Sequence, residues 1–504
     1  MNIPKEVKQI ADRLSETGYQ VYLVGGCLRD LLLEREPKDW DIATDAKPEE
    51  VQKLFKDSVY ENNFGTVGVK TDSENPTLKI VEVTTLRKEG KYTDKRHPDS
   101  VSFAKNIEED LARRDFTVNA IAFNLTSSKD LRFSDDRNIV DPFGGKKDLK
   151  DRTIRAVGDP EKRFEEDALR LMRAVRFAAQ LNFAIEPKTA AAIKNKDGLL
   201  EFVSKERTRD EFCKLLMTGK AAEGVRKMLE LGLLKIVIPE LVEGVGVEQN
   251  KHHVYDVFEH NLRSLEYAVE KNHPLDARLS ALLHDVGKPK SRRWQNDPAG
   301  PKAYQGKKGD WTFYGHQVVG EKMVLKIMDR LRFSKELTEK VALLVREHMF
   351  VYDPEAVTLK GVRRILNRVG QENIDDLIRL READRIGSGV PKAQPYRLRY
   401  LQAMIEKVKK DPVGPKMLKI NGEDVMKILK TEPGPKIGAV LAVLLEEVLD
   451  NPKLNEKKKL EARVKALGKL SEKELAAMRA KAQKAAAQAQ ERIDEEVKKK
   501  YFVR

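Results

Sequence analysis

The sequence predicts an α+β protein in which a sheet-containing N-terminal part precedes a much longer helical remainder. Short apolar runs typical of strands occur early in the chain, at residues 21–24, 65–69 and 78–85. From residue 164 onward, segments with helical patterns follow one another, separated by Gly and Pro. A chain of 504 residues is also long enough to form several domains.

Composition excludes several classes of protein. No run of 18 apolar residues is present, so no membrane span is expected, and the N-terminus lacks the apolar region of a signal peptide. Two cysteines, Cys27 and Cys213, are too few for a disulfide framework or a thiolate zinc site. We therefore expect a protein of the reducing cytoplasm.

The charge of the chain favours a polyanionic partner. The formal net charge is +14, and residues 451–504 hold sixteen Lys and Arg against eight Asp and Glu. This basic tail is interpreted either as a solvated helix or as a contact to a nucleic-acid backbone.

A candidate anion site directly follows the first predicted strand. Gly25 and Gly26 lead from this strand into a helix expected at residues 27–33. Backbone N–H groups at a Gly pair can approach an anion closely, and the helix N-terminus adds a favourable dipole. Arg29 supplies a forked cation suited to a phosphate. The alternative interpretation is a simple turn.

Carboxylates follow this candidate anion site. Asp39 and Asp41 flank Trp40, and both point to one face if the chain is extended there. Paired carboxylates are ligands that Mg²⁺ prefers, with phosphate oxygens completing the octahedron. Glu82, in the strand at 78–85, is either a third acidic group of the same sheet or an exposed strand residue.

A second basic and polar element lies further along the head. Arg113, Arg114 and Asp115 stand just before an apolar run that contains Asn119. Taken alone, the three charged residues favour the start of a helix with charged ends.

The helix expected at residues 164–180 carries regularly spaced charges. Asp167, Arg170, Arg173 and Arg176 recur every three residues, which is also the spacing of ordinary surface ion pairs. A more specific interpretation is base selection. An Asp acceptor beside an Arg donor matches the Watson–Crick edges of cytosine and adenine, and it mismatches those of uracil and guanine.

Imidazoles and carboxylates gather in the helical part. They stand at or near the ends of separate predicted helices, and one His-Asp pair is adjacent. Such donors suit Mn²⁺, Fe²⁺, Co²⁺, Ni²⁺ or Zn²⁺, although a lone His is more often a core residue. The candidate ligands are His260, His284, Asp285, His316, His348 and Asp384.

The pattern Gly-Gly-x-x-Arg-Asp followed by Asp-x-Asp resembles the nucleotidyltransferases related to polymerase β. It is specifically similar to the bacterial class II tRNA nucleotidyltransferase (CCA-adding) and poly(A) polymerase family, as are Arg-Arg-Asp-Phe-Thr-x-Asn-Ala at 113–120 and Glu-Asp-x-x-Arg at 166–170. The resemblance covers about residues 1–450. It implies a polymerase-β-like head, an all-α neck, an HD domain and a helical tail.

The resemblance also implies roles for the candidate residues. Asp39, Asp41 and Glu82 would be catalytic, with Mg²⁺ on the first two. Arg114 would meet the triphosphate, and Asp167 with Arg170 would select the base. The full set of predicted nucleotide-binding residues is Gly25, Gly26, Arg29, Arg114, Asp115, Asn119, Asp167, Arg170, Arg173 and Arg176.

The histidine-rich part is similar to HD-type metal-dependent phosphohydrolases. By this resemblance His260, His284, Asp285 and Asp384 match the core ligands, and His316 and His348 match the extra positions of two-metal versions. In some relatives of the tRNA enzyme this domain hydrolyses phosphate esters, and in others it only supports tRNA. The intact ligand set favours an active metal site.

These inferences predict four regions: a nucleotidyltransferase head at 1–155, a neck at 156–245, an HD domain at 246–390 and an RNA-binding C-terminal region at 391–504. The predicted function is template-independent addition of CCA to the tRNA 3′ end from CTP and ATP. A loop at 87–101 resembles one found in enzymes that add the final A.

Three alternatives remain open at the level of sequence. The enzyme could add A alone, it could be a poly(A) polymerase, or it could be an HD phosphohydrolase whose inactive head only binds RNA. The HD segment disfavours poly(A) polymerases, which generally lack it. The sequence leaves the oligomeric state open.

Overall fold

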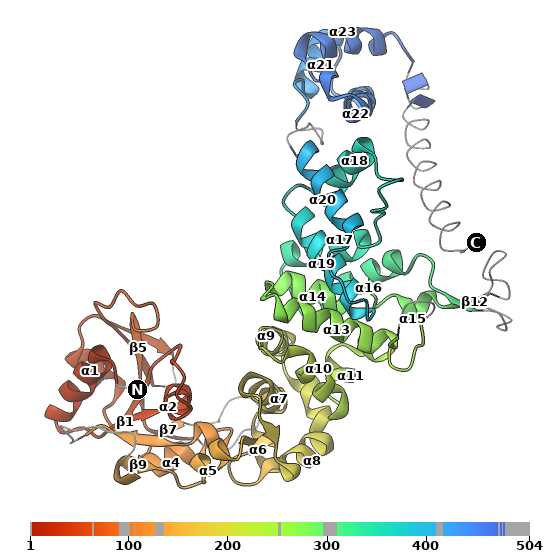
Figure 1. Ribbon diagram of the computed structural model, residues 1–504. Coiled ribbons are helices and arrows are strands. Elements are labelled where there is room, and N and C mark those ends of the chain that lie inside the picture. Colours follow the sequence, from red (N-terminus) through yellow and green to blue (C-terminus); the bar gives the residue numbers. More distant parts are fainter. Residues whose placement is uncertain are drawn as a thin grey trace. The chain divides into compact units, whose positions relative to one another are not determined.

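The computed structural model describes residues 3–62, 65–89, 101–104, 106–126, 136–249, 254–295, 310–409, 417–471, 474–475 and 477–478. The chain forms two compact units, Met1–Pro239 and Glu240–Arg504, which are described separately (Figure 1). Most of the loop at 87–101 and all of the basic tail beyond residue 478 lie outside the described residues.

A seven-stranded mixed sheet forms the head of the first unit. Its strands lie in the order β3-β4-β5-β2-β1-β8-β9, and only β2 and β5 pair in parallel. The strands are β1 (Val21–Val24), β2 (Asp41–Thr44), β3 (Ser58–Asn62), β4 (Thr66–Lys70), β5 (Ile80–Thr85), β8 (Ala122–Asn124) and β9 (Ile139–Val140). Two further pairs are β6 (Arg87–Glu89) with β7 (Val101–Phe103) and β10 (Thr153–Ile154) with β11 (Ala184–Ile185).

Alternating burial on β5 follows from the period of a strand. Val81 and Val83 are fully buried, while Glu82 and Thr84 on the opposite face are half-buried. The helices of the head are α1 (Lys5–Glu16), α2 (Gly25–Leu32), α3 (Pro48–Leu54), α4 (Ile107–Ala112) and α5 (Gly145–Lys150), with short 3₁₀ turns at Thr117–Asn119 and Asp136–Asn138.

The charged element at residues 113–115 does not start a helix. It follows the C-terminal end of α4, and the apolar run behind it forms a 3₁₀ turn and strand β8. The interpretation as a helix start with charged ends was therefore wrong. The run is strand because Ala122 and Phe123 pair with β1 in the centre of the sheet.

The neck of the first unit is helical, as expected, but its charged helix is interrupted. The sequence predicted one helix at 164–180, whereas the structure ends α6 (Pro160–Glu166) and starts α7 (Leu169–Leu181). Asp167 has an extended backbone there, and its carboxylate accepts a hydrogen bond from the Leu169 N–H. The neck continues with α8 (Pro187–Lys196), the 3₁₀ segment Asp197–Phe202, α9 (Lys205–Leu216), α10 (Ala221–Glu230) and α11 (Leu234–Val237).

The second unit is helical apart from one short hairpin, β12 (Arg293–Gln295) with β13 (Asp310–Thr312), among the residues described. Its first helices follow the short α12 (Pro239–Val242). They are α13 (Val257–Glu270), α14 (Leu275–Leu283), α15 (Lys288–Ser291), α16 (His316–Arg330), α17 (Lys335–Glu347), α18 (Leu359–Val369), α19 (Ile374–Gly387) and α20 (Tyr396–Val408).

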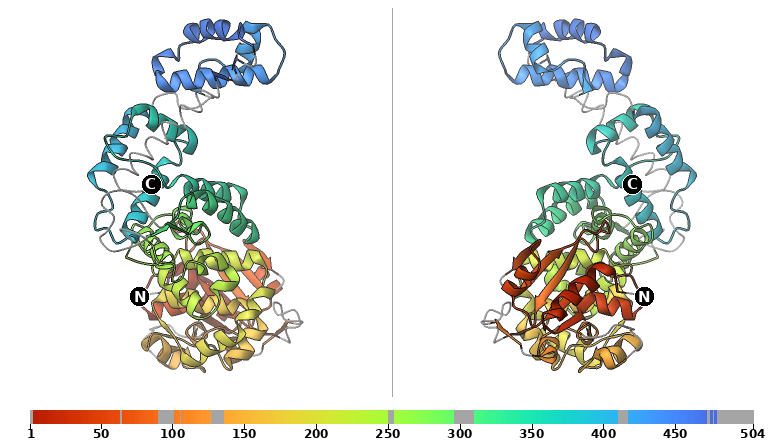
Figure 2. Two further views of the ribbon diagram at one scale, coloured as in Figure 1. Left: turned by 90° about the vertical axis from the view of Figure 1, so that its right-hand side faces the viewer. Right: turned by 90° about the vertical axis from the view of Figure 1, so that its left-hand side faces the viewer.

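The end of the described chain is a small helical group whose apolar core is continuous with that of the preceding helices. It contains α21 (Gly422–Leu429), α22 (Pro435–Asp450), the 3₁₀ turn Pro452–Leu454 and α23 (Lys457–Gly468). Val425, Val440 and Val464 are fully buried in its core. In the described parts of the chain, no helix combines the length and apolarity that crossing a bilayer requires. The turned views of Figure 2 show the large sheet confined to the N-terminal, red and orange part. The predicted α+β class is confirmed.

Candidate active site and candidate metal centre

An acidic cluster lies where α2 meets the parallel pair β2–β5. Asp41 on β2 is the register partner of Glu82 on β5, so the two carboxylates are cross-strand neighbours. Asp39 stands just ahead of β2, which begins at Asp41 rather than at Trp40. Trp40 is buried and anchors the turn between the two aspartates.

Positive φ and the close approach of neighbouring side chains favour glycine at position 25. Gly25 has φ +74°, and a methyl group added to it would lie 3.0 Å from Oδ2 of Asp41 and 3.2 Å from Nη1 of Arg114. A methyl on Gly26 would lie 3.8 Å from Oδ1 of Asp39. The N-terminus of α2 therefore faces the acidic cluster directly.

Clustering strongly perturbs one carboxyl group. Burial, followed by repulsion from Asp39 and Glu82, raises the pKa of Asp41 to about 7, although Arg114 and Arg29 act in the opposite direction. A carboxylate in this position is stabilised when a cation comes close. The donor set, carboxylates that line one cavity, suits a hard divalent cation such as Mg²⁺.

Arginines line the same cavity, which has a volume of about 1060 Å³. Arg29 is buried, donates to Oδ1 of Asn119 over 2.9 Å and pairs with Asp30 at 2.7 Å. Arg114 is held by Asp110, with 3.1 Å between Nη2 and Oδ2. Burial opposes ionisation of Asp110, but Arg114 and Arg113 outweigh it and lower its pKa.

Asp115 joins the head to helix α7. Its carboxylate accepts from Nε of Arg173 over 2.8 Å and from Nδ2 of Asn119 over 3.3 Å. Burial alone would raise the pKa of Asp115, but Arg173 and Arg170 lower it to about 2. The Phe177 ring packs under three guanidinium groups, with the Arg176 guanidinium carbon 3.9 Å from the ring centroid.

The side chains of the two candidate base-selecting residues are held by different partners. Asp167 accepts from Arg207 of α9 over 2.9 Å, and Arg170 donates to Glu166 over 2.6 Å. Arg176 pairs with Glu211, also on α9. Arg170 pairs with Glu166, four residues earlier and across the break between α6 and α7, whereas Asp167, Arg173 and Arg176 are held by other elements. For those three the surface ion-pair interpretation was wrong.

All thirteen residues predicted for the nucleotide site line this one cavity. They are Gly25, Gly26, Arg29, Asp39, Asp41, Glu82, Arg114, Asp115, Asn119, Asp167, Arg170, Arg173 and Arg176. Their chemical roles remain predictions. Sequence reasoning missed Asp110 and Phe177. Asp110 stands at the i−4 position from Arg114, a helical spacing that could have revealed the pair.

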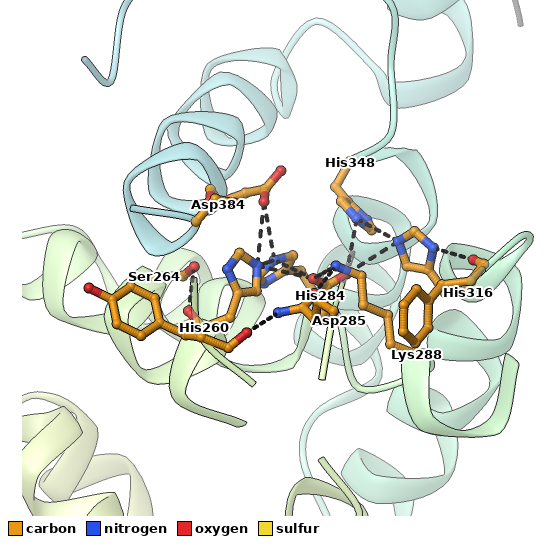
Figure 3. Close-up of polar contacts among 12 residues, drawn as sticks. His260, Ser264, His284, Asp285, Lys288, His316, His348 and Asp384 are labelled. Atoms are coloured by element: carbon orange, nitrogen blue, oxygen red, sulfur yellow. Dashed lines mark hydrogen bonds and ion pairs between the residues drawn. The ribbon is translucent and has the colours of Figure 1, made fainter. Parts of the chain in front are cut away.

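A second constellation forms the centre of the HD-like part. Four imidazoles and two carboxylates converge from α13, α14, α16, α17 and α19 (Figure 3). Asp285 lies between two groups. Its Oδ2 is 3.0 Å from Nε2 of His260, and its Oδ1 is 3.2 Å from Nε2 of His316. Asp384 completes the first group and His348 the second.

Backbone acceptors orient the imidazoles. The Nδ1 atoms of His284, His316 and His348 lie 2.7–2.9 Å from the carbonyl oxygens of Ala281, Phe313 and Val345. With Nδ1–H donating there, the Nε2 lone pairs point into the centre, as in metal-binding histidines (Figure 3). The residues therefore fit two metal ions that share one carboxylate.

Electrostatics at this centre shift the pKa values of two imidazoles in opposite directions. Burial opposes the charged form of His284, yet Asp285 and Asp384 raise its pKa to about 9. Burial and the neighbouring imidazoles lower the pKa of His348 to about 4. The ammonium of Lys288 is 2.5 Å from Oδ2 of Asp285. The carboxylates of Asp285 and Asp384 therefore already interact with cationic side chains of the protein itself.

Three family models match the chain in the expected order. They are the poly A polymerase head domain at residues 21–155, the probable RNA- and SrmB-binding site of polymerase A at 182–244, and the HD domain at 257–388.

Relatives agree with these models. The chain is 36% identical over 359 residues to an A-adding tRNA nucleotidyltransferase of Deinococcus radiodurans, covering 69% of this chain and 76% of the relative. It is 49% identical over 207 residues to a CCA-adding enzyme of Lactobacillus helveticus, covering 41% of this chain and 48% of that enzyme. The chain thus spans about half the length of that relative.

A solved structure gives the most complete match of the three. The CCA-adding enzyme of Bacillus stearothermophilus, in complex with CTP, is 28% identical with a TM-score of 0.67, covering 92% of this chain and 97% of that one. Together, head, neck and HD domain define a nucleotidyltransferase. The chain belongs to the family of tRNA nucleotidyltransferases and poly(A) polymerases.

Proposed function

We propose that this protein adds C, C and A to the 3′ end of tRNA, using CTP and ATP and releasing pyrophosphate. The observation that carries the proposal is the single cavity in which an acidic cluster faces a wall of arginines. CCA-adding relatives and the CTP-bound structural neighbour support the same activity. In the reaction, the tRNA 3′ oxygen forms a bond to the α-phosphorus, and the bond to the leaving pyrophosphate breaks.

The carboxylates would hold Mg²⁺. Asp39 and Asp41 are the proposed ligands, with Glu82 beside them on β5. When bound, Mg²⁺ supplies polarisation of the α-phosphate and a lower pKa for the attacking hydroxyl. Arg29 and Arg114 would neutralise the triphosphate, and the amides at the N-terminus of α2 would donate to its oxygens.

Base selection is assigned to Asp167 and Arg170. Both line the cavity, and both are positioned by neighbours, Arg207 and Glu166 respectively. The Asp accepts from the exocyclic amine of cytosine or adenine, and the Arg donates to the adjacent ring nitrogen. Uracil and guanine present the opposite order and would leave buried polar groups unpaired.

Two alternatives keep the fold and change the product. Addition of A alone has a named relative, but the CCA-adding relatives reach higher identity and the CTP-bound neighbour covers nearly the whole chain. A poly(A) polymerase would generally lack the HD domain that this chain contains. We therefore favour complete CCA addition.

Three tRNA transcripts test the proposal. They end before the CCA, after one C and after both, and each is incubated with Mg²⁺ and CTP, ATP or both before the 3′ ends are sequenced. Complete CCA on the shortest transcript is expected. Addition of A to the CC-ended transcript alone would replace it with the A-adding alternative, and long A tails would indicate a poly(A) polymerase.

The HD centre is proposed to be a metal-dependent phosphohydrolase. His260, His284, Asp285 and Asp384 would hold one transition-metal ion, and Asp285, His316 and His348 a second. Mn²⁺, Fe²⁺, Co²⁺, Ni²⁺ and Zn²⁺ suit such donors, and bound ions supply an activated water nucleophile. Lys288 would neutralise charge on the phosphate ester.

Chelation separates the two activities. Hydrolysis of phosphate esters should be lost in EDTA, return with one of the transition metals, and survive the change of both Asp39 and Asp41 to Ala. Hydrolysis with no nucleotide addition by the unaltered protein would instead favour an HD phosphohydrolase with an inactive head.

We place the protein in the cytoplasm because both cysteines are free thiols.

A further inference from the structure

The hairpin β12–β13 is joined at both ends to segments that contribute to the HD centre. Its first strand begins soon after α15, which starts at Lys288, and its second strand ends shortly before His316. Figure 1 shows β12 beside α15, away from the helices that supply the other ligands. The two strands pair in register, so that Trp294 lies opposite Trp311.

The two tryptophans form an exposed aromatic surface. Their rings meet edge to face with centroids 5.1 Å apart, and 52% of Trp294 is accessible to solvent. A cross-strand Trp pair can stabilise a short hairpin on its own. That role explains the contact between the rings, but it does not account for the solvent exposure of Trp294.

Cations border this aromatic surface. Between Lys288 and Gln295 the sequence has four cationic residues and no acidic one. Arg292 stacks on Trp311, with its guanidinium carbon 3.9 Å from a ring centroid. Its buried Nε has no hydrogen-bond partner among the described residues. Among the described residues, neither Arg292 nor Arg293 forms an ion pair.

We propose that Trp294, Trp311 and Arg292 bind the terminal nucleotide of a single-stranded RNA whose end phosphate enters the HD centre. Aromatic rings beside cations bind single-stranded nucleic acid by stacking on bases and pairing with phosphates. This inference rests on the proposed phosphohydrolase function. It makes nucleotide-ended RNA, rather than small phosphate esters without a base, the substrate class of that centre.

Short segments of chain connect the stacking surface to the centre. The carbonyl of Phe313, next to β13, lies 2.8 Å from Nδ1 of His316, and the Phe313 ring lies 6.0 Å from the ammonium of Lys288. The hairpin that would bind the base is therefore joined directly to one candidate metal ligand and to the candidate phosphate-binding lysine.

Binding of short oligonucleotides tests the proposal. The probes are a fluorescent trinucleotide with a 3′-phosphate and the same molecule with an abasic last residue, titrated against the full chain in EDTA. Trp294→Ala should weaken binding of the normal trinucleotide by about 5- to 100-fold, while Trp294→Phe should change it by less than about threefold. The control Tyr396→Ala removes an exposed aromatic of α20 and should change nothing.

The outcomes separate the stacking surface from the hydrolase. The unaltered protein should bind the abasic probe as weakly as Trp294→Ala binds the normal one, and with metal the KM for hydrolysis should rise in parallel at similar kcat. Equal loss of both probes in Trp294→Ala would overturn base stacking. If Trp294→Ala kept its affinity for RNA but lost self-association in sedimentation, the surface would instead bind a second copy of the chain, and this result would also overturn the proposal. RNA binding through Trp294 without hydrolysis would refute the hydrolase alone.

Discussion

At the scale of residues, the nucleotide site depends on close approach between a glycine, a carboxylate and a guanidinium. A methyl group added to Gly25 would press against the side chains of Asp41, at 3.0 Å, and Arg114, at 3.2 Å. At the same place burial, followed by repulsion from Asp39 and Glu82, raises the pKa of Asp41 to about 7. A buried carboxyl group with a raised pKa is expected at a functional site, because the group serves ligand binding at the expense of stability.

Replacing Gly25 by Ala should impair catalysis beyond its cost in stability. The methyl would contact Asp41 and Arg114, and nucleotide addition should fall at least tenfold, on the order of the effect of misplaced catalytic groups. The matched control is Gly18→Ala, because Gly18 also has positive φ but no atom within 4 Å of the added methyl. Both variants should lose about 1 kcal/mol of stability, measured by urea unfolding. Equal activity of the two variants would contradict the geometric argument.

Asp41→Asn should abolish nucleotide addition yet stabilise the metal-free protein. Between about pH 4 and pH 7 native Asp41 keeps a proton that the unfolded chain has lost, so stability falls as pH rises through this window. Above pH 7 the Asn variant should gain at most about 4 kcal/mol, seen as a higher Tm in EDTA. The control Asp72→Asn alters an exposed carboxyl and should leave both activity and Tm unchanged. A lower Tm for Asp41→Asn at pH 8 would refute the assigned pKa shift.

At the scale of elements, helix α9 positions the charged residues around α7. Arg207 holds Asp167 and Glu211 holds Arg176, so one helix supports two residues of the cavity wall. The break between α6 and α7 is part of the same arrangement, because it turns the Asp167 carboxylate toward the N-terminus of α7. Charged residues that resemble a surface ladder are thereby positioned by tertiary contacts.

Arg207→Gln should weaken base discrimination. Losing a charge-assisted hydrogen bond to Asp167 costs roughly 1.5–3 kcal/mol of positioning, so preference for CTP over UTP should fall by roughly tenfold or more. Single-turnover incorporation of each nucleotide measures the ratio. Arg209→Gln is the control, since Arg209 pairs with its exposed neighbour Asp210. An unchanged CTP to UTP ratio in Arg207→Gln would mean that α9 does not position the selector.

At the scale of the whole molecule, the two candidate sites lie in different compact units. Among the described residues, those that line the nucleotide cavity precede Gly219, and the candidate HD ligands follow Glu240. Each site has its own carboxylates and its own core, so metal binding at one does not depend on ligands of the other.

Asp285→Asn should remove one activity and spare the other. Asp285 joins both ligand groups, so its loss should reduce bound transition metal, measured by plasma mass spectrometry, and hydrolysis by about 100-fold or more. Addition of CCA should stay within about twofold. Asp329→Asn, an exposed carboxyl on α16, controls for the charge change. Loss of nucleotide addition in Asp285→Asn would show that the two units are coupled.

Local patterns in the sequence predicted much of this protein. The strand–Gly-Gly–helix element, the alternation on β5 and the histidines at helix ends follow from nearest neighbours in the chain, which is why they were found. The family, the α+β class and the enzyme class are confirmed. The four-part domain division and the site roles stay predictions.

Tertiary structure decided which residues act together. Periodicity made Asp167 part of a continuous helix, but its carboxylate caps α7 and pairs with Arg207 forty residues later. Only the parallel register of β2 and β5 places Glu82 beside Asp41, and only folding brings Asp285 between two groups of histidines. Spacing fixes contacts within one helix or strand, whereas pairings between distant elements depend on how their buried faces pack.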